Sequence, residues 1–170
     1  MDIVEKTNIK NNILKCIDMC GGLTGKFAKK LCDDDSIYRE LMEDGKIKRI
    51  PIEVKMSDKT TKKMYLFAYN NKQKASQFPH MKEDDARYIS ILNNCYCSYP
   101  NAQWFERSDI HRFVETAGVT DTKLIPRLMF FSEDKIVAVY MKKSYAKLTE
   151  KERQVIDEKL NVNIVLEYLY

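Results

Sequence analysis

The sequence has no apolar run near the roughly 20 residues that a helix needs to cross a bilayer. Its first ten residues, MDIVEKTNIK, lack the apolar core of a secretory signal peptide. The cysteines number five, an odd count that argues against a framework of paired disulfides. We therefore expect a cytoplasmic protein with reduced thiols and no membrane contact.

Patterns for catalysis and metal binding are also scarce. The two histidines, His80 and His111, have no metal-ligand spacing, and Cys95 and Cys97 are too close for a Cys-x-x-Cys knuckle. The segment GGLTGK has the Gly-Lys pair of a phosphate-binding loop, but Phe27 stands where that motif needs Ser or Thr. We expect no catalysis, no metal and no cofactor.

What the chain does contain is enough apolar material for a packed interior. Its 170 residues are 44% hydrophobic and 32% charged, which fits one domain or two small ones. The formal charge of +4 permits a phosphate-bearing partner without requiring one.

The first 70 residues alternate helical and strand patterns in a definite order. Three amphipathic helical patterns come first, Gly45 ends the third, and two strand patterns follow around a polar turn. The expected helices are Thr7–Met19, Thr24–Cys32 and Ser36–Asp44; the strands are Lys46–Lys55 and Lys63–Tyr69, with the turn at Met56–Lys62. This order predicts a winged helix-turn-helix domain over residues 1–70.

The remainder predicts a linker at 71–78 and a small mixed α/β domain at 79–170, so that the whole chain is of the α+β class. In this second domain, Thr149 and Glu152 have the spacing of a capping box. The expected helices are Glu83–Tyr96, Ser108–Ala117 and Thr149–Leu160; the strands are Leu128–Ser132, Lys135–Lys142 and Val162–Tyr170.

Basic residues gather in the predicted winged helix. Between Thr24 and Lys63 there are eleven Lys and Arg against eight Asp and Glu. The third helix usually reads the major groove, yet here Arg39 is its one basic residue. We expect phosphate contacts from the second helix and the wing. The candidate DNA-binding residues are Lys26, Lys29, Lys30, Arg39, Lys59, Lys62 and Lys63.

The last third of the chain has the layout of a degenerate restriction-endonuclease-like core. Such nucleases carry Pro-Asp on one strand and Glu-x-Lys on the next, and the acids hold Mg²⁺. Here Arg127 follows Pro126, and Tyr140 stands two residues before Lys142. Both carboxylates are replaced, which predicts either an inactive relic of that core or an unrelated small sheet.

Two segments resemble winged-helix proteins of bacterial plasmids and integrative elements, such as the replication-relaxation family. They are LTGKFAKKLCDDDSIYRELMEDGKIKRIPI at 23–52 and LIPRLMFFSEDKIVAVYMKK at 124–143. The resemblance implies an N-terminal winged helix, a nuclease-like C-terminal half, and a role in replication, transfer or regulation of a mobile element.

The resulting expectation is a non-catalytic protein that binds double-stranded DNA with weak sequence preference. The alternative is a protein-interaction adaptor that docks through its winged helix. The acidic third helix favours that alternative, and Tyr96, Tyr99, Trp104 and Phe105 are its candidate contact residues. The sequence leaves the oligomeric state open.

Overall fold

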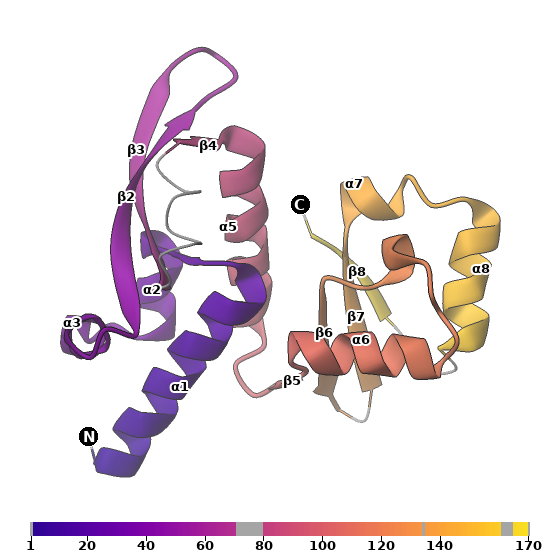
Figure 1. Cartoon of the computed structure of the whole chain (residues 1–170), viewed down its shortest axis with the longest axis horizontal. Helices are drawn as coiled ribbons and strands as arrows, with labels where there is room; N and C mark the ends of the chain where they lie inside the picture. The colour runs from indigo at the N-terminus through magenta and orange to yellow at the C-terminus, as the bar shows by residue number, and fades with distance from the viewer. Residues whose placement is uncertain (1, 71–79, 134, 161–164, 170) are drawn as a thin grey trace. The chain divides into compact units, whose positions relative to one another are not determined.

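The computed structural model describes residues 2–70, 80–133, 135–160 and 165–169, and they form two compact units (Figure 1). The first unit spans Met1–Ser98 and the second Tyr99–Tyr170. Each unit combines helices with a four-stranded sheet, so the α+β class is confirmed. No helix within the described ranges has both the length and the apolar composition needed to cross a bilayer.

The first unit contains four helices and four strands among its described residues. The helices are α1 (Ile3–Cys20), α2 (Gly25–Leu31), α3 (Asp35–Glu43) and α5 (Glu83–Ser98); the strands are β1 (Leu23–Thr24), β2 (Ile47–Lys55), β3 (Thr61–Tyr69) and β4 (His80–Lys82). The sheet order is β1-β3-β2-β4, with β4 parallel to β2 and the other pairs antiparallel. The sequence missed β1, because two residues are too few to show a strand period.

Helix α1 begins at Ile3, before the expected start at Thr7, because Asp2 caps it. The Asp2 carboxylate accepts a hydrogen bond from the backbone N–H of Glu5, which satisfies a free donor at the helix start. Thr7 lies inside the helix, where its hydroxyl donates to the carbonyl oxygen of Ile3. The other predicted helices and strands of this unit end within two residues of the observed bounds.

Helix α5 packs in the first unit, whereas the expected boundary at 71–78 would assign it to the second. It covers the face of the β2–β3 hairpin that carries Ile52, Val54 and Leu66, against which its Ala86 and Ile89 are buried. The boundary therefore follows α5 at Ser98. The predicted linker lies outside the described residues.

The second unit is built on a mixed sheet of order β5-β6-β7-β8. Its strands are β5 (Gln103–Trp104), β6 (Leu128–Ser132), β7 (Lys135–Met141) and β8 (Val165–Leu169); its helices are α6 (Arg107–Thr116), the 3-10 turn η1 (Thr122–Leu124), α7 (Lys142–Tyr145) and α8 (Glu150–Lys159). Strand β6 pairs antiparallel with both β5 and β7, while β8 runs parallel to β7. Helix α8 makes the connection that a parallel pair requires.

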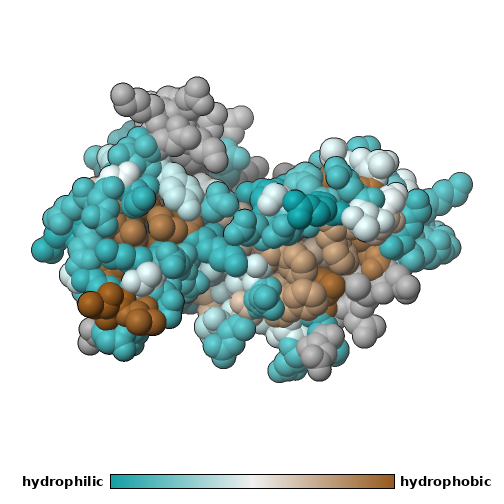
Figure 2. Space-filling view, turned by 60° about the horizontal axis from the view of Figure 1, so that its bottom comes forward, coloured by the Kyte–Doolittle hydropathy of each residue, from teal (hydrophilic) through white to brown (hydrophobic). Residues whose placement is uncertain are grey.

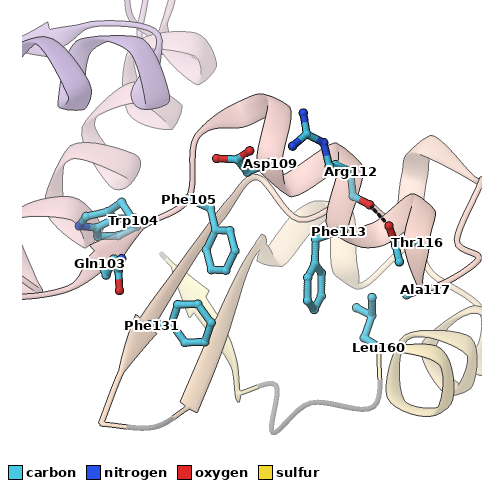
Figure 3. Close-up of a pocket in the computed structure, with 10 residues that line it drawn as sticks. All are labelled: Gln103, Trp104, Phe105, Asp109, Arg112, Phe113, Thr116, Ala117, Phe131 and Leu160. Carbon is cyan, nitrogen blue, oxygen red and sulfur yellow. Dashed lines mark hydrogen bonds between the residues drawn. The ribbon is translucent and has the colours of Figure 1, made fainter.

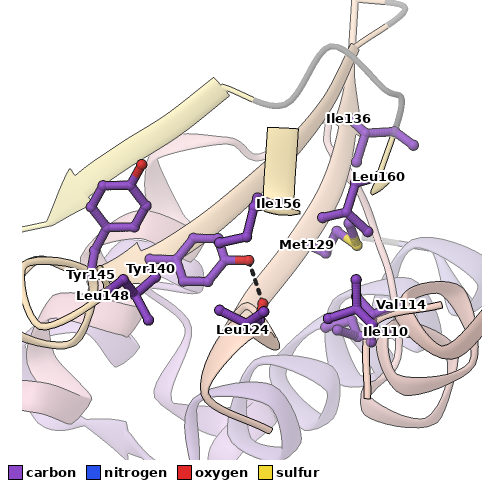
Figure 4. Packing of buried hydrophobic residues seen from close by; sticks show 12 residues of the cluster. Ile110, Val114, Leu124, Met129, Ile136, Tyr140, Tyr145, Leu148, Ile156 and Leu160 are labelled. Atoms are coloured by element: carbon purple, nitrogen blue, oxygen red, sulfur yellow. Dashed lines mark hydrogen bonds between the residues drawn. The ribbon is translucent and has the colours of Figure 1, made fainter. Parts of the chain in front are cut away.

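The core of the second unit lies between α6, α8 and the sheet (Figure 4). Ile110 and Val114 of α6, Met129 of β6 and Ile156 of α8 are fully or almost fully buried there. The predicted capping box is confirmed: the Thr149 hydroxyl accepts from the backbone N–H of Glu152, whose carboxylate accepts from the backbone N–H of Thr149.

Candidate nucleic-acid interface

All seven basic residues predicted to contact DNA are exposed, and they lie on three structural elements. Helix α2 carries Lys26, Lys29 and Lys30, helix α3 carries Arg39, and the β2–β3 hairpin carries Lys59, Lys62 and Lys63. Exposure leaves these cations available to phosphates, which are recognised mainly by charge.

Helix α2 presents its lysines because its apolar side chains are turned inward. Phe27 and Ala28 are the buried residues of this seven-residue helix. The Nζ atoms of Lys26 and Lys30 lie 5.6 and 5.0 Å from the centre of the Phe27 ring. Such cation–aromatic contacts hold the two lysine stems close to the helix surface.

Two acids, Glu40 of α3 and Asp44 just after it, are paired with lysines of α1. Glu40 forms ion pairs with Lys6 and Lys10 of α1, and Lys10 also lies 3.6 Å from Asp44 just beyond α3. The hydrogen bond from Lys6 is the main reason that the pKa of Glu40 lies below its ordinary value. These acids are thus held by α1 and are not part of the outward face.

The outward face of α3 remains poor in positive charge. Asp35, Arg39 and Glu43 follow one another at four-residue spacing, and all three are exposed. Arg39 forms no ion pair within the described ranges. One arginine between two carboxylates gives this face of α3 a net negative charge, which opposes its insertion into the major groove.

Lys62 and Lys63 lie on opposite faces of the hairpin because successive strand residues alternate in direction. Lys63 pairs in register with Glu53 and shares its face with Phe67, whose ring stacks on Tyr38 of α3 at 4.8 Å. Lys62 pairs with Val54, on the face covered by α5. The structure therefore places Lys63, but not Lys62, on the α3 side of the hairpin.

Lys59 lies in the turn at the tip of the hairpin and has a left-handed backbone with φ of 68°. The turn is fixed by Asp58, whose carboxylate accepts from both the backbone N–H and the hydroxyl of Thr60. The hydroxyl hydrogen bond is the main cause of the lowered pKa of Asp58. The tip therefore carries one cation and one ionised acid.

Arg49 and Tyr65 are two further surface residues that the sequence prediction did not include. The guanidinium carbon of Arg49 lies 3.9 Å from the centre of the Tyr65 ring, on the same hairpin face as Lys63. The Tyr65 ring also covers Gly25 at the start of α2, where an added Cβ would approach the ring within 2.3 Å. This pair could not be identified without the strand register, since 16 positions separate the two residues in the sequence.

Net charge is concentrated in the first unit. Residues 1–98 contain 18 Lys and Arg against 14 Asp and Glu, while residues 99–170 contain 11 of each. The whole formal charge of +4 thus belongs to the unit that presents the α2 and hairpin lysines.

Two thiols of the first unit, those of Cys16 and Cys97, are held in their neutral form. Cys16 and Cys20 are buried with their sulfur atoms 4.0 Å apart, and this contact raises the pKa of Cys16 well above its ordinary value. Burial raises the pKa of Cys97 to about 11. A thiol is a poor nucleophile when its thiolate is disfavoured.

The nuclease-like positions of the second unit are taken up by structural contacts. Tyr140 is buried, and its hydroxyl donates to the carbonyl oxygen of Leu124 at 2.6 Å (Figure 4). The backbone N–H of Arg127 donates to the carbonyl oxygen of Val139. Strand β7 ends at Met141, so the expected strand end at Lys142 is wrong: Lys142 begins α7.

No cluster of three or more His, Cys, Asp or Glu side chains suited to a metal ion occurs among the residues that the structure describes. No protein-family model, curated protein or solved structure matches the chain.

Proposed function

We propose that the first unit is a winged helix that binds double-stranded DNA without catalysis. The order α1-β1-α2-α3-β2-β3, with β1 paired to β3, supports this proposal. The observation that carries it is the exposure of the α2 lysines, Arg39, Lys59 and Lys63 on the unit that holds the entire positive charge.

In this proposal α2 and the hairpin supply most of the affinity. Helix α3 has an acidic outward face, so it does not insert deeply between the bases, and Arg39 is its single contact. Lys63 and Arg49 extend the contact along the α3 side of the hairpin. Binding through phosphates releases counterions, which makes affinity fall steeply with salt and depend little on sequence.

The test is a fluorescence-anisotropy titration of a mixed-sequence duplex at low and near-physiological salt. Lys63→Ala should weaken binding several-fold at every sequence and lower the salt slope by about one, as expected for one lost phosphate contact. Lys62→Ala is the matched control, because its side chain lies on the opposite face. Equal losses of DNA affinity for the two variants would contradict a contact on the Lys63 face of the hairpin. No binding at low salt would overturn the proposal.

The second candidate function is a protein-interaction adaptor, and one specific observation favours it. The outward face of α3 carries Asp35 and Glu43 around Arg39, which suits a basic protein surface better than DNA. Of the aromatics expected to serve this role, Tyr96 and Trp104 are buried, while Tyr99 and Phe105 are half-buried. A pull-down that recovers one partner after nuclease treatment, and loses it with Glu43→Lys, would favour the adaptor.

Only the sequence resemblance to winged-helix proteins of bacterial plasmids and integrative elements indicates a biological role. A role in replication, transfer or regulation of a bacterial mobile element therefore belongs to the proposal. It is tested by measuring copy number or transfer frequency of an element that encodes the chain, with and without Lys63→Ala.

A further inference from the structure

The second unit has an open aromatic hollow of about 630 Å³, which Phe105, Phe113 and Phe131 help to line (Figure 3). Figure 2 shows tan and brown atoms gathered on this face of the second unit. The ring centre of Phe105 lies 5.0 Å from that of Phe131, and both Phe105 and Phe113 pack against the unit's own core. These rings therefore extend that core. The rings of the first unit differ, because they lead to an exposed cation.

Three aromatic rings of the first unit form a continuous stack from α3 to the surface of the hairpin. Tyr38 of α3 and Phe67 of β3 are buried, and their ring centres lie 4.8 Å apart. The half-buried Tyr65 meets Phe67 edge-on at 5.6 Å. The guanidinium carbon of Arg49 lies 3.9 Å from the centre of the Tyr65 ring. The buried rings thus support an exposed arginine at the outer end of the stack.

Helix α2 holds this stack at both ends. The Tyr38 hydroxyl donates to the carbonyl oxygen of Ala28 at 2.7 Å. The hydroxyl end of the Tyr65 ring lies against Gly25, where an added Cβ would overlap it, so only glycine allows this approach. Main-chain atoms of α2 and the buried Phe67 therefore fix the position of Tyr65.

Arg49 has N–H donors available at the edge of its guanidinium. Its side chain is exposed and forms no ion pair or hydrogen bond within the ranges that the structure describes. Glu53, the acid on the same face of the hairpin, lies in register with Lys63. A guanidinium carries five N–H groups in one plane, and stacking over a ring leaves the edges of that plane open.

A phosphate is the acceptor that fits this arrangement. Two of its oxygens can accept parallel N–H groups from one guanidinium, whereas a lysine ammonium binds as a point charge. An arginine already held on a ring also loses less side-chain freedom on binding than an unsupported lysine.

We propose that Gly25 and Tyr65 are positioning residues that hold the Arg49 guanidinium as a two-pronged donor to one backbone phosphate of DNA. Arg49 touches the phosphate, and the other two residues act through it. Arg49 therefore contributes more to affinity than Lys63 does. Because the phosphate belongs to the bound duplex, this role rests on the proposed function.

Fluorescence anisotropy with the full chain and a mixed-sequence duplex separates the charge of Arg49 from its geometry. Arg49→Ala should weaken binding at least about tenfold, as expected for a lost hydrogen-bonded charge, and lower the salt slope by about one. Arg49→Lys keeps the charge, so the slope should stay while affinity falls several-fold. Arg87→Ala, which removes an exposed arginine of α5 outside the stack, is the matched control and should bind like the wild type.

Substitutions that leave Arg49 in place test its support. Tyr65→Leu should lower affinity several-fold at an unchanged salt slope, and Tyr65→Phe, which keeps the ring, should restore the affinity. Gly25→Ala displaces the ring and should act like Tyr65→Leu. In an Arg49→Ala background, neither Tyr65→Leu nor Gly25→Ala should weaken binding further. Far-UV circular dichroism checks that each variant is folded.

Three results would overturn this role while the wild type still binds DNA. One is an Arg49→Lys variant that binds as tightly as the wild type, because charge alone would then suffice. The second is a Tyr65→Leu loss of equal size with and without Arg49, which would indicate a purely structural residue. The third is an Arg49→Ala loss that depends on guanine in the duplex, which would assign Arg49 to a base edge. A wild-type chain that binds no duplex at low salt would overturn the proposed function itself, and this role with it.

Discussion

The side-chain amide nitrogen of Asn93 donates to the carbonyl oxygen of Gly22 at 2.9 Å. Its amide oxygen accepts from the backbone N–H of Thr24 at 3.0 Å, and Asn93 is fully buried. One side chain of α5 thus satisfies both backbone groups around β1, 69 to 71 residues earlier in the chain. These bonds explain why α5 belongs to the first unit.

We predict that Asn93→Ala destabilises the protein by roughly 2–4 kcal/mol, since it leaves a buried donor and a buried acceptor without partners. Urea denaturation followed by circular dichroism measures this. Asn94→Ala is the control, because Asn94 is exposed on the same helix. If the two variants lost equal stability, Asn93 would not anchor α5.

Substitution of Gly25 tests the contact between α2 and the hairpin. The Cβ of Gly25→Ala would meet the Tyr65 ring, so we expect a loss of about 1–3 kcal/mol from overpacking. In a Tyr65→Ala background the ring is gone, and alanine should stabilise α2 by up to about 1 kcal/mol relative to glycine. Thermal denaturation of the wild type, the two single variants and the double variant measures this. The effect of Gly25→Ala on stability should change from a loss in the wild type to a gain in the Tyr65→Ala background. The same cost in both backgrounds would contradict the contact.

The ion pairs between α1 and α3 predict a defined pH dependence. Glu40 has a lowered pKa in the folded protein, so its contribution to stability is present above the unfolded pKa and is lost as the pH falls through the folded pKa. Glu40→Gln should be less stable than the wild type at neutral pH, and the difference should vanish in acid.

Urea unfolding of both proteins at a series of pH values measures this difference. Glu43→Gln is the control, since Glu43 lies on the outward face of the same helix and forms no ion pair among the described residues. A Glu40→Gln difference that stayed constant with pH would show that ion pairing is not its cause.

The capping box gives a prediction for the second unit. Thr149→Ala removes the hydroxyl that accepts from the backbone N–H of Glu152 and should cost about 1 kcal/mol. The check is the midpoint of urea unfolding, compared with that of Thr120→Ala, an exposed threonine outside the helices. Equal midpoints for the two variants would mean that the cap adds nothing.

Much of the local structure was determined by the sequence. The helical stripes, the stop at Gly45, the hairpin and the Thr149 capping box are short-range patterns, and each was confirmed within a few residues. Exposure of Lys26, Lys29 and Lys30 also followed from their position opposite the apolar residues of α2. Short-range patterns depend on residues close in the chain, so periodicity reveals them.

Tertiary structure decided which distant residues meet. The two bonds of Asn93, the Arg49–Tyr65 contact and the placement of Lys63 rather than Lys62 on the α3 side all depend on strand register or on helix docking. A shift of one residue in register would move every hairpin side chain to the other face. The burial of Trp104 and the exposure of Phe131 are likewise set by the pairing of β5 with β6 and by the helix beside it, which no pattern within either strand specifies.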